Sequence, residues 1–416
     1  MGQAAEQTHP VATPAHRMNT SRVVALSSAV AFATQVAFAL LMLRWFSPQE
    51  VGEFSVISQI GFFWMTLALA QSQLSVLANQ HLSAHTAAQH AWRTSALRGL
   101  ALLPIAALAV WFSQLAMWPT LLWAMLLAVC QMGWMLAQSF TLRAGSALQQ
   151  AAVRVLPPIT AAAVALTAAM AGAALGWHGP SLVLSALLGY AVGALWLVPA
   201  LRARATPAAT HHETQTQSDP RSAALRIAHT LVDALLATAI LVVWQRLYGA
   251  EETGWMSALL RVLGFVPAVV HVAWAQVVLA KGLQPNRATP WWIGIGAFAC
   301  VIALGLACAL ALYQGWLDPR WDGVWHYIAP LVLWQGCACL SAAFSYRPFQ
   351  TGAAGAYSWA CIGLASLQVL ALLAPMLIAA PIEKSMHIVT FAGISSLGLC
   401  ALTLWLTATH HQINQP

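Results

Sequence analysis

The chain has 416 residues, of which 60% are hydrophobic and 7% charged, and its formal net charge is +7. An ordinary soluble domain has about 25% charged residues, so this composition excludes a soluble enzyme, a disordered chain and a disulfide scaffold. The mean hydropathy is +0.70, and long apolar runs recur along almost the whole chain. These features predict an all-α integral membrane protein, because backbone groups in lipid must bond within their own helix.

A polar tail, residues 1–20, precedes the first apolar run, and both Met1 and Met18 are candidate start residues. The next residues imitate a cleavable signal peptide, but the apolar run continues to Phe46, which predicts an uncleaved first helix. Twelve runs reach the length of a spanning helix, roughly 20 residues. In chain order they are Val23–Phe46, Phe54–Ala78, Gly99–Met117, Leu121–Leu142, Val155–Leu175, Ser181–Leu201, Ala224–Tyr248, Trp255–Leu279, Trp291–Tyr313, Trp325–Phe344, Ala354–Ile378 and Ile388–Ala408.

Basic residues are distributed unevenly between the links that join these helices. If the N-terminus is inside, most of the 18 Lys and Arg residues fall on the inner side, and four fall on the outer side: Arg44, Arg246, Arg320 and Lys384. The positive-inside rule therefore predicts that both termini face the cytoplasm. The asymmetry also explains the positive net charge without a nucleic-acid partner, because basic loops face anionic lipid head groups.

One long polar link, residues 203–222, divides the helices into two bundles of six, residues 21–202 and 223–409, followed by a short tail, residues 410–416. A shift of 202 positions aligns Arg44 with Arg246, Glu50 with Glu252, and Gly52 with Gly254, and Ser55 with Ser257 follows. In each half the matched segment joins the first helix to the second. The pattern predicts a parallel repeat related by an axis along the membrane normal.

The links also limit the chemistry of the protein. The outer links are short, whereas membrane enzymes that polymerise or ligate glycans usually need a large folded outer loop. No P-loop, G-x-S-x-G or H-E-x-x-H motif occurs, and the seven Cys residues have no zinc-ligand spacing. We therefore expect no catalytic residue, no metal site and no cofactor other than a coupling H⁺ or Na⁺. A secondary transporter or a lipid translocase is the class that this leaves.

After the first helix the chain reads Arg44-Trp45-Phe46-Ser47-Pro48-Gln49-Glu50-Val51-Gly52-Glu53-Phe54-Ser55. This segment resembles the polysaccharide flippases (O-antigen-type, Wzx-like) of the multidrug/oligosaccharidyl-lipid/polysaccharide exporter superfamily. Members commonly have a basic residue and then a Pro–acidic–hydrophobic–Gly–aromatic turn, and here Ser47 replaces the more usual Gly. The resemblance implies a flippase/MATE-like fold, with two six-helix bundles around a central cavity, and alternating access that is often driven by an ion gradient.

The acidic residue that lies deepest in a predicted helix is Asp233, in the seventh helix, and His229 lies one turn earlier on the same face. A lone carboxylate in a bilayer costs about 2.5–3.5 kcal/mol on insertion scales, so Asp233 should face a cavity or a partner. Two interpretations stay open. Either the pair binds a proton or a cation and couples transport to the gradient of that ion, or it forms a polar contact that holds two helices together.

Arg261 lies within the eighth helix, and a guanidinium there suits a diphosphate, because its paired donors match phosphate oxygens. Arg44 and Arg246 flank the expected outer mouth, either as a positive rim for the substrate or as helix-end anchors.

The resemblance implies that helices one, two, seven and eight line the cavity, which favours Gln35, Gln71 and Gln73 as ligands of sugar hydroxyls. Hydrogen bonding between helices is the alternative role of these amides.

The resemblance implies translocation of a polyprenyl-pyrophosphate-linked oligosaccharide across the bacterial inner membrane. The glycan would be a repeat unit of O-antigen, capsule or exopolysaccharide, with glycosyltransferases and a polysaccharide polymerase as partner enzymes. The alternatives are a multidrug or small-molecule exporter of the same superfamily, and a membrane glycan polymerase or ligase. One intramembrane carboxylate against Arg261 and the rim arginines favours an anionic substrate.

Overall fold

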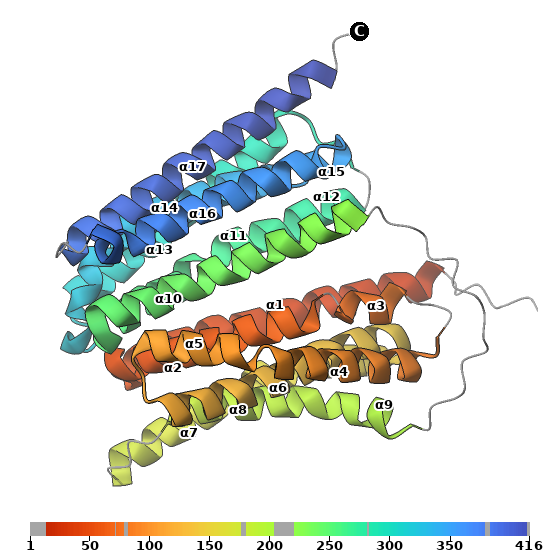
Figure 1. The fold of residues 1–416 in the computed structure, drawn as a ribbon, viewed down its shortest axis with the longest axis horizontal. Helices are drawn as coiled ribbons and strands as arrows, with labels where there is room; N and C mark the ends of the chain where they lie inside the picture. Colours follow the sequence, from red (N-terminus) through yellow and green to blue (C-terminus); the bar gives the residue numbers. More distant parts are fainter. Residues whose placement is uncertain are drawn as a thin grey trace, which may run out of the picture.

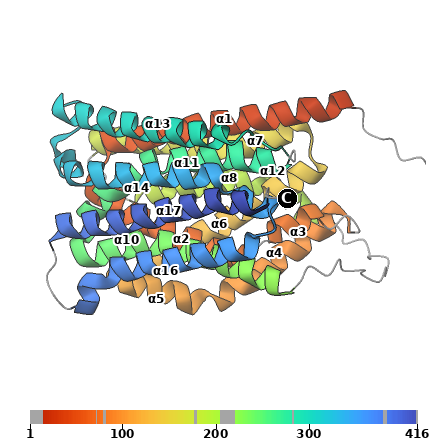
Figure 2. The same ribbon diagram turned by 90° about the horizontal axis from the view of Figure 1, so that it is seen from above.

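The computed structural model describes residues 14–70, 72–78, 82–175, 180–203, 220–280, 283–378 and 383–413. Within these ranges the chain forms helices and no strand, which confirms the all-α prediction. The helices run along a common axis and form an N-terminal and a C-terminal lobe (Figures 1 and 2). We call the end of the bundle at which the first helix ends the gate end. The opposite end, where residues 203 and 220 lie, is the linker end.

The N-terminal lobe contains a bent span, in which two helices meet at 49°. Its α-helices are α1 (Pro14–Trp45), α2 (Pro48–Leu69), α3 (Ser72–Ala78), α4 (Ala84–Ala101), α5 (Leu103–Ser113), α6 (Met117–Ala144), α7 (Ala147–Leu175), α8 (Ser181–Ala194) and α9 (Val198–Arg202). The bent span consists of α4 and α5. All six helices predicted for this half are present.

The C-terminal lobe begins with a helix that contains two of the predicted spans. Its α-helices are α10 (Pro220–Leu263), α11 (Phe265–Val269), α12 (Gln276–Ala280), α13 (Ala288–Tyr313), α14 (Trp325–Phe344), α15 (Arg347–Gln350), α16 (Ala354–Ile378) and α17 (Lys384–Ile413). Gly249 interrupts α10 with φ 88° and ψ 179°, a backbone conformation that favours glycine. The chain turns back there at the gate end (Figure 1). A π-helical segment, Val270–Ala275, joins α11 to α12.

Nine of the described helices are long and apolar enough to cross a membrane, or ten when α4 and α5 count as one span. This count takes α10 once and leaves out α1, whose described apolar stretch Ala33–Trp45 is shorter. Each of the twelve predicted spans corresponds to one described helix, to part of one, or to consecutive helices, as in the span made of α4 and α5. The chain is a multi-pass membrane protein.

Several helices extend beyond their predicted ends. Helix α2 begins at Pro48 rather than Phe54, because Ser47 and Glu50 form a capping box. The Ser47 backbone N–H donates to Glu50 Oε2 (2.8 Å), and the Glu50 N–H donates to Ser47 Oγ (3.3 Å). Helices α1, α10 and α17 likewise extend into the predicted polar segments 1–20, 203–222 and 410–416.

The two lobes touch at the gate end through a reciprocal glycine contact. A Cβ atom on Gly52 would lie 1.9 Å from the Ala250 carbonyl oxygen, and one on Gly254 would lie 1.8 Å from the Pro48 carbonyl oxygen. The 202-position shift aligns Gly52 with Gly254 and Pro48 with Ala250. The two contacts are therefore equivalent, as a parallel repeat requires. Glycine is therefore necessary at both positions for the helices to approach this closely.

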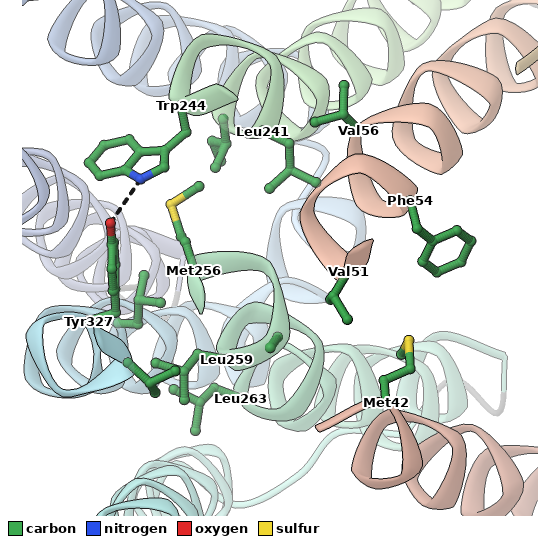
Figure 3. Close-up of a cluster of buried hydrophobic side chains, with 14 of the residues drawn as sticks. Met42, Val51, Phe54, Val56, Leu241, Trp244, Met256, Leu259, Leu263 and Tyr327 are labelled. Carbon is green, nitrogen blue, oxygen red and sulfur yellow. Dashed lines mark hydrogen bonds between the residues drawn. The ribbon is translucent and has the colours of Figure 1, made fainter. Parts of the chain in front are cut away.

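Apolar side chains from both lobes pack in one cluster that includes Val51 and Met256, which are close in sequence to the two glycines (Figure 3). Met42, Val51 and Phe54 of the N-terminal lobe belong to one buried cluster with Leu241 and Met256 of the C-terminal lobe. Packing of this kind brings helices together within lipid, where lipid tails are as apolar as the side chains. The gate end is therefore closed.

Replacement of Gly254 by alanine should open the gate end. Alanine in a helix is intrinsically favoured over glycine by about 0.5–1 kcal/mol, whereas overpacking costs about 1–3 kcal/mol. The closed population should therefore fall several-fold to tenfold or more. The measurement is the distance between two spin labels, one placed at position 49 and one at position 251, in a protein whose native cysteines have been replaced. Gln49 and Glu251 are exposed, one on each side of the contact.

Gly296→Ala is the matched control, because a Cβ at Gly296 meets nothing within 4 Å. A distance distribution in Gly254→Ala identical to that of the control would contradict the assignment of the gate.

Candidate functional site

A cavity of about 880 Å³ lies between the lobes, directly below the closed gate. Helices α1, α2, α6, α7 and α8 form one wall, and α10, α11, α13 and α14 form the other. Met42 and Phe54 belong both to the cavity wall and to the gate cluster. The cavity is therefore shared by the two lobes, and any movement at the gate changes its shape.

Arg261 is the one charged residue among the described residues that line this cavity. It extends from α10 to the opposite lobe, where Nη2 donates to Ser55 Oγ at 3.0 Å and Nη1 to Met42 Sδ at 3.8 Å. Its guanidinium carbon lies 4.7 Å from the centre of the Phe54 ring. A hydroxyl, a thioether and an aromatic face are neutral partners, so the positive charge is not balanced by an anion in this part of the chain.

The other polar groups of the cavity are amides and hydroxyls. Gln35 is exposed on α1, and Gln59 Nε2 donates across the lobes to Thr238 Oγ1 at 3.5 Å. Gln131 on α6 is 9% exposed, and Tyr190 on α8 is half-buried. Most of the remaining lining is apolar, which is typical of sites that bind amphipathic molecules.

Asp233 and His229 form the predicted pair on α10. The distance from His229 Nε2 to Asp233 Oδ2 is 3.3 Å, with 22% and 60% of the respective side chains exposed. The His229 ring packs against Tyr357 of α16, at 5.9 Å between ring centres. Asp233 thus has a partner, as expected. It does not belong to the described cavity lining.

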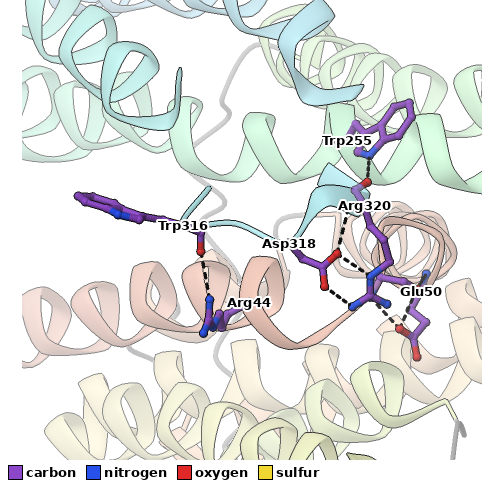
Figure 4. Close-up of polar contacts among 7 residues, drawn as sticks. Arg44, Glu50, Trp255, Trp316, Asp318 and Arg320 are labelled. Atoms are coloured by element: carbon purple, nitrogen blue, oxygen red, sulfur yellow. Dashed lines mark hydrogen bonds and ion pairs between the residues drawn. The ribbon is translucent and has the colours of Figure 1, made fainter. Parts of the chain in front are cut away.

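Arg44 and Arg246 both lie near the gate end, one in each lobe. Arg44 Nη1 donates to the carbonyl oxygen of Trp316 at 3.1 Å, which ties α1 to the link between α13 and α14 (Figure 4). Arg246 lies over the ring of Phe112 in the other lobe, 5.8 Å from its centre. Both arginines therefore make contacts between the lobes, and neither belongs to the described cavity lining.

We call residues 314–324 the gate loop. Asp318 accepts two hydrogen bonds from the Arg320 side chain, at 2.9 and 3.0 Å, and one from its backbone N–H (Figure 4). These bonds lower the pKa of Asp318 to about 2. The stabilisation from a lowered pKa is complete above the ordinary value and is lost as the pH falls through about 2, so the gate loop keeps its shape at physiological pH.

Of the two other predicted glutamines, Gln73 does not line the described cavity. Gln71 lies outside the described residues. Gln73 lies on α3 near the linker end, and its Oε1 is buried with no partner among the described residues. Ala70, in the left-handed conformation, ends α2 just before these two residues. The predicted unbroken helix Phe54–Ala78 is therefore wrong at this point.

Sequence reasoning did not identify Trp134 and Tyr190 of the cavity wall, or Ser55 as the partner of Arg261. The shift of 202 positions pairs Ser55 with Ser257, and both line the cavity. That identity was the available signal for Ser55. No spacing marks the two aromatic residues, because they lie on different helices.

No family model and no curated protein matches the sequence. Among solved structures, the lipid II flippase MurJ in its inward closed conformation aligns with a TM-score of 0.60 at 10% identity, over 93% of this chain and 87% of that chain. An inward-facing multidrug resistance MATE family transporter of the MOP superfamily aligns with a TM-score of 0.48 at 12% identity, over 94% and 96% of the two chains. The MATE multidrug transporter DinF-BH aligns with a TM-score of 0.47 at 12% identity, over 98% of each chain.

At these identities the comparison establishes the fold alone. The chain has the flippase fold of MurJ, which confirms the predicted architecture of two helical bundles around a cavity.

Proposed function

We propose that this protein moves a polyprenyl-pyrophosphate-linked oligosaccharide across the bacterial inner membrane, with the gate end facing outward and both termini in the cytoplasm. Arg261 is the observation that carries the proposal. It is a lone cation in a cavity between two lobes, and its described partners are neutral. A diphosphate supplies the negative charge that these partners lack. The flippase fold of MurJ, a lipid II flippase, supports the same reading.

The contacts of Arg261 suggest how substrate binding leads to movement. In the gate-closed state its guanidinium bridges the lobes through Ser55. A diphosphate that enters from the linker end competes for the same donors, and a bond between two charged groups is about twice as strong as one to a neutral hydroxyl. The cross-lobe bond is then lost, and rocking of the lobes opens the gate while the lipid tail stays in the bilayer.

Asp233 and His229 are proposed to couple this movement to H⁺ or Na⁺. The pair lies on the half of α10 that precedes the turn at Gly249, and it contacts α16 through Tyr357. A partly exposed carboxylate between helices of one lobe can bind a cation and change their packing. Glycosyltransferases that build the glycan and a polymerase that extends it would act before and after this step.

The rival function is export of amphipathic small molecules. The aromatic and aliphatic lining of the cavity favours it. It fits the charge less well, because a cationic drug calls for a carboxylate, and the described lining contains none.

Replacement of Arg261 by glutamine should lower glycan export at least about 100-fold, because two charge-assisted hydrogen bonds, each about 1.5–3 kcal/mol, are lost. Arg261→Lys should retain part of the activity, since it keeps the charge but not the paired donors. The measurement is the amount of surface glycan in the native host, after deletion of its own copy and expression of each variant at equal level.

Arg287→Gln, at an exposed link position, is the matched control and should export normally. Full export by Arg261→Gln would refute the proposed role. A deletion strain with intact glycan and new sensitivity to amphipathic drugs would favour the rival function.

Substitution of Asp233 by asparagine should remove the dependence of transport on the coupling ion, because the amide keeps the size of the side chain but cannot change its charge. The assay is flipping of a fluorescent diphosphate lipid in proteoliposomes, with an H⁺ or Na⁺ gradient imposed in turn. Thr230→Val, on the preceding turn, is the control. An unchanged response of Asp233→Asn to the gradient would remove the pair from the coupling mechanism.

A further inference from the structure

One wall of the cavity carries a stacked aromatic pair that the transport cycle described above does not use. Trp134 of α6 and Tyr190 of α8 have ring centres 5.3 Å apart and planes inclined by 28°. Both are half-buried, and both line the cavity. The pair therefore presents aromatic surface to any molecule in the cavity.

The surrounding chain fixes the orientation of these rings. Trp134 Nε1 donates to the Val153 carbonyl oxygen at 2.7 Å. A Cβ on Gly193 would lie 2.3 Å from Trp134 Cδ1, so α8 approaches the indole this closely because position 193 is glycine. Rings held in this way lose little conformational freedom when a ligand binds.

Polar groups without protein partners adjoin the pair. Gln131 lies one turn before Trp134 on α6, is 9% exposed and lines the cavity. No hydrogen bond links its amide, or the Tyr190 hydroxyl, to another group of the described chain. Neither group is among the fully buried polar atoms without a partner, and both residues line the cavity, so their donors and acceptors are open to a molecule that enters it.

The opposite wall is mostly aliphatic, with Ile240, Leu241, Leu260 and Val266 of α10 and α11, and it also contains Phe265 and Trp334. Arg261 provides the charge of this wall, and Tyr190 lines the facing wall of the same cavity. A molecule with an anionic group at Arg261 would therefore place its neighbouring part against the N-terminal wall.

We propose that Tyr190, Trp134 and Gln131 form a subsite for the sugar next to the diphosphate, in which the ring packs its C–H face on the aromatic pair. The sugar hydroxyl or acetamido groups bond the Gln131 amide and the Tyr190 hydroxyl, which supply both donors and acceptors. This inference rests on the proposed function and deepens it, because it makes the glycan itself a recognised part of the substrate.

The experiment compares two probes that differ by one sugar. Geranylgeranyl diphosphate and the same lipid bearing one N-acetylglucosamine are titrated into the full-length protein in nanodiscs, and Kd is measured for each by calorimetry. The wild type should bind the glycosylated probe about tenfold more tightly, since one ring contact and one or two hydrogen bonds are gained. Tyr190→Ala and Gln131→Leu should bring the ratio close to one.

Two further variants separate the contribution of the Tyr190 ring from that of its hydroxyl and provide a control outside the subsite. Tyr190→Phe keeps the ring and loses the hydroxyl, so its ratio should lie between those of the wild type and Tyr190→Ala. It also guards against misfolding of the alanine variant. Tyr313→Ala, whose side chain is 80% exposed, is the matched control and should retain the full ratio.

The outcomes separate this inference from the proposed function. Equal Kd values of the two probes for the wild type, or an unchanged ratio in all three subsite variants, would overturn the sugar subsite while leaving the flippase proposal intact. Failure of the wild type to bind either diphosphate would overturn the flippase proposal itself. Arg261→Gln should weaken both probes by the same factor and preserve the ratio.

Discussion

A guanidinium inside a membrane protein needs acceptors, and Arg261 finds only neutral ones in the described chain. The proposed binding of an anionic substrate and the proposed opening of the gate both depend on this imbalance of charge. The closed gate brings Met42, Phe54 and Ser55 to the guanidinium, so the packing at the gate and the charge in the cavity are linked. An anion that replaces these neutral partners would be bound more tightly than any group that the protein itself provides.

The repeat explains why the gate is symmetric and the cavity is not. At the gate the 202-position shift converts the Gly52 contact into the Gly254 contact. Deeper in the cavity the same shift pairs Arg261 with Gln59, which bonds Thr238 instead of carrying a charge. The repeated segments thus close the gate end equally from both lobes, while the divergence of one pair of positions gives the cavity a charge on one side.

Glu50 and Glu252, which the 202-position shift aligns, also have different roles in the two lobes. Glu50 caps the start of α2 through Ser47. Glu252 accepts a hydrogen bond of 2.6 Å from the Tyr327 hydroxyl and pairs with Lys384. The first therefore fixes a helix start, and the second fastens α10 to α14 and α17 within the C-terminal lobe. Such internal bonds favour movement of that lobe as a unit.

Hydropathy predicted the helices because the requirement of lipid for satisfied backbone groups acts on long stretches of sequence. The i, i+4 spacing of His229 and Asp233 predicted their pairing for the same local reason. The start of α2 was misjudged because a capping box outweighs the polar character of residues 48–53. The Trp134–Tyr190 pair could not be foreseen, since its stacking depends on how α6 and α8 pack, which no local pattern encodes.

The most direct test of the central claim is an experimental structure of the protein with geranylgeranyl diphosphate bound. We expect density for the diphosphate between the lobes, within hydrogen-bond distance of the Arg261 guanidinium. We also expect that the hydrogen bond between Arg261 and Ser55 is broken. Density for the diphosphate outside the cavity, with the Arg261–Ser55 bond intact, would contradict the central claim.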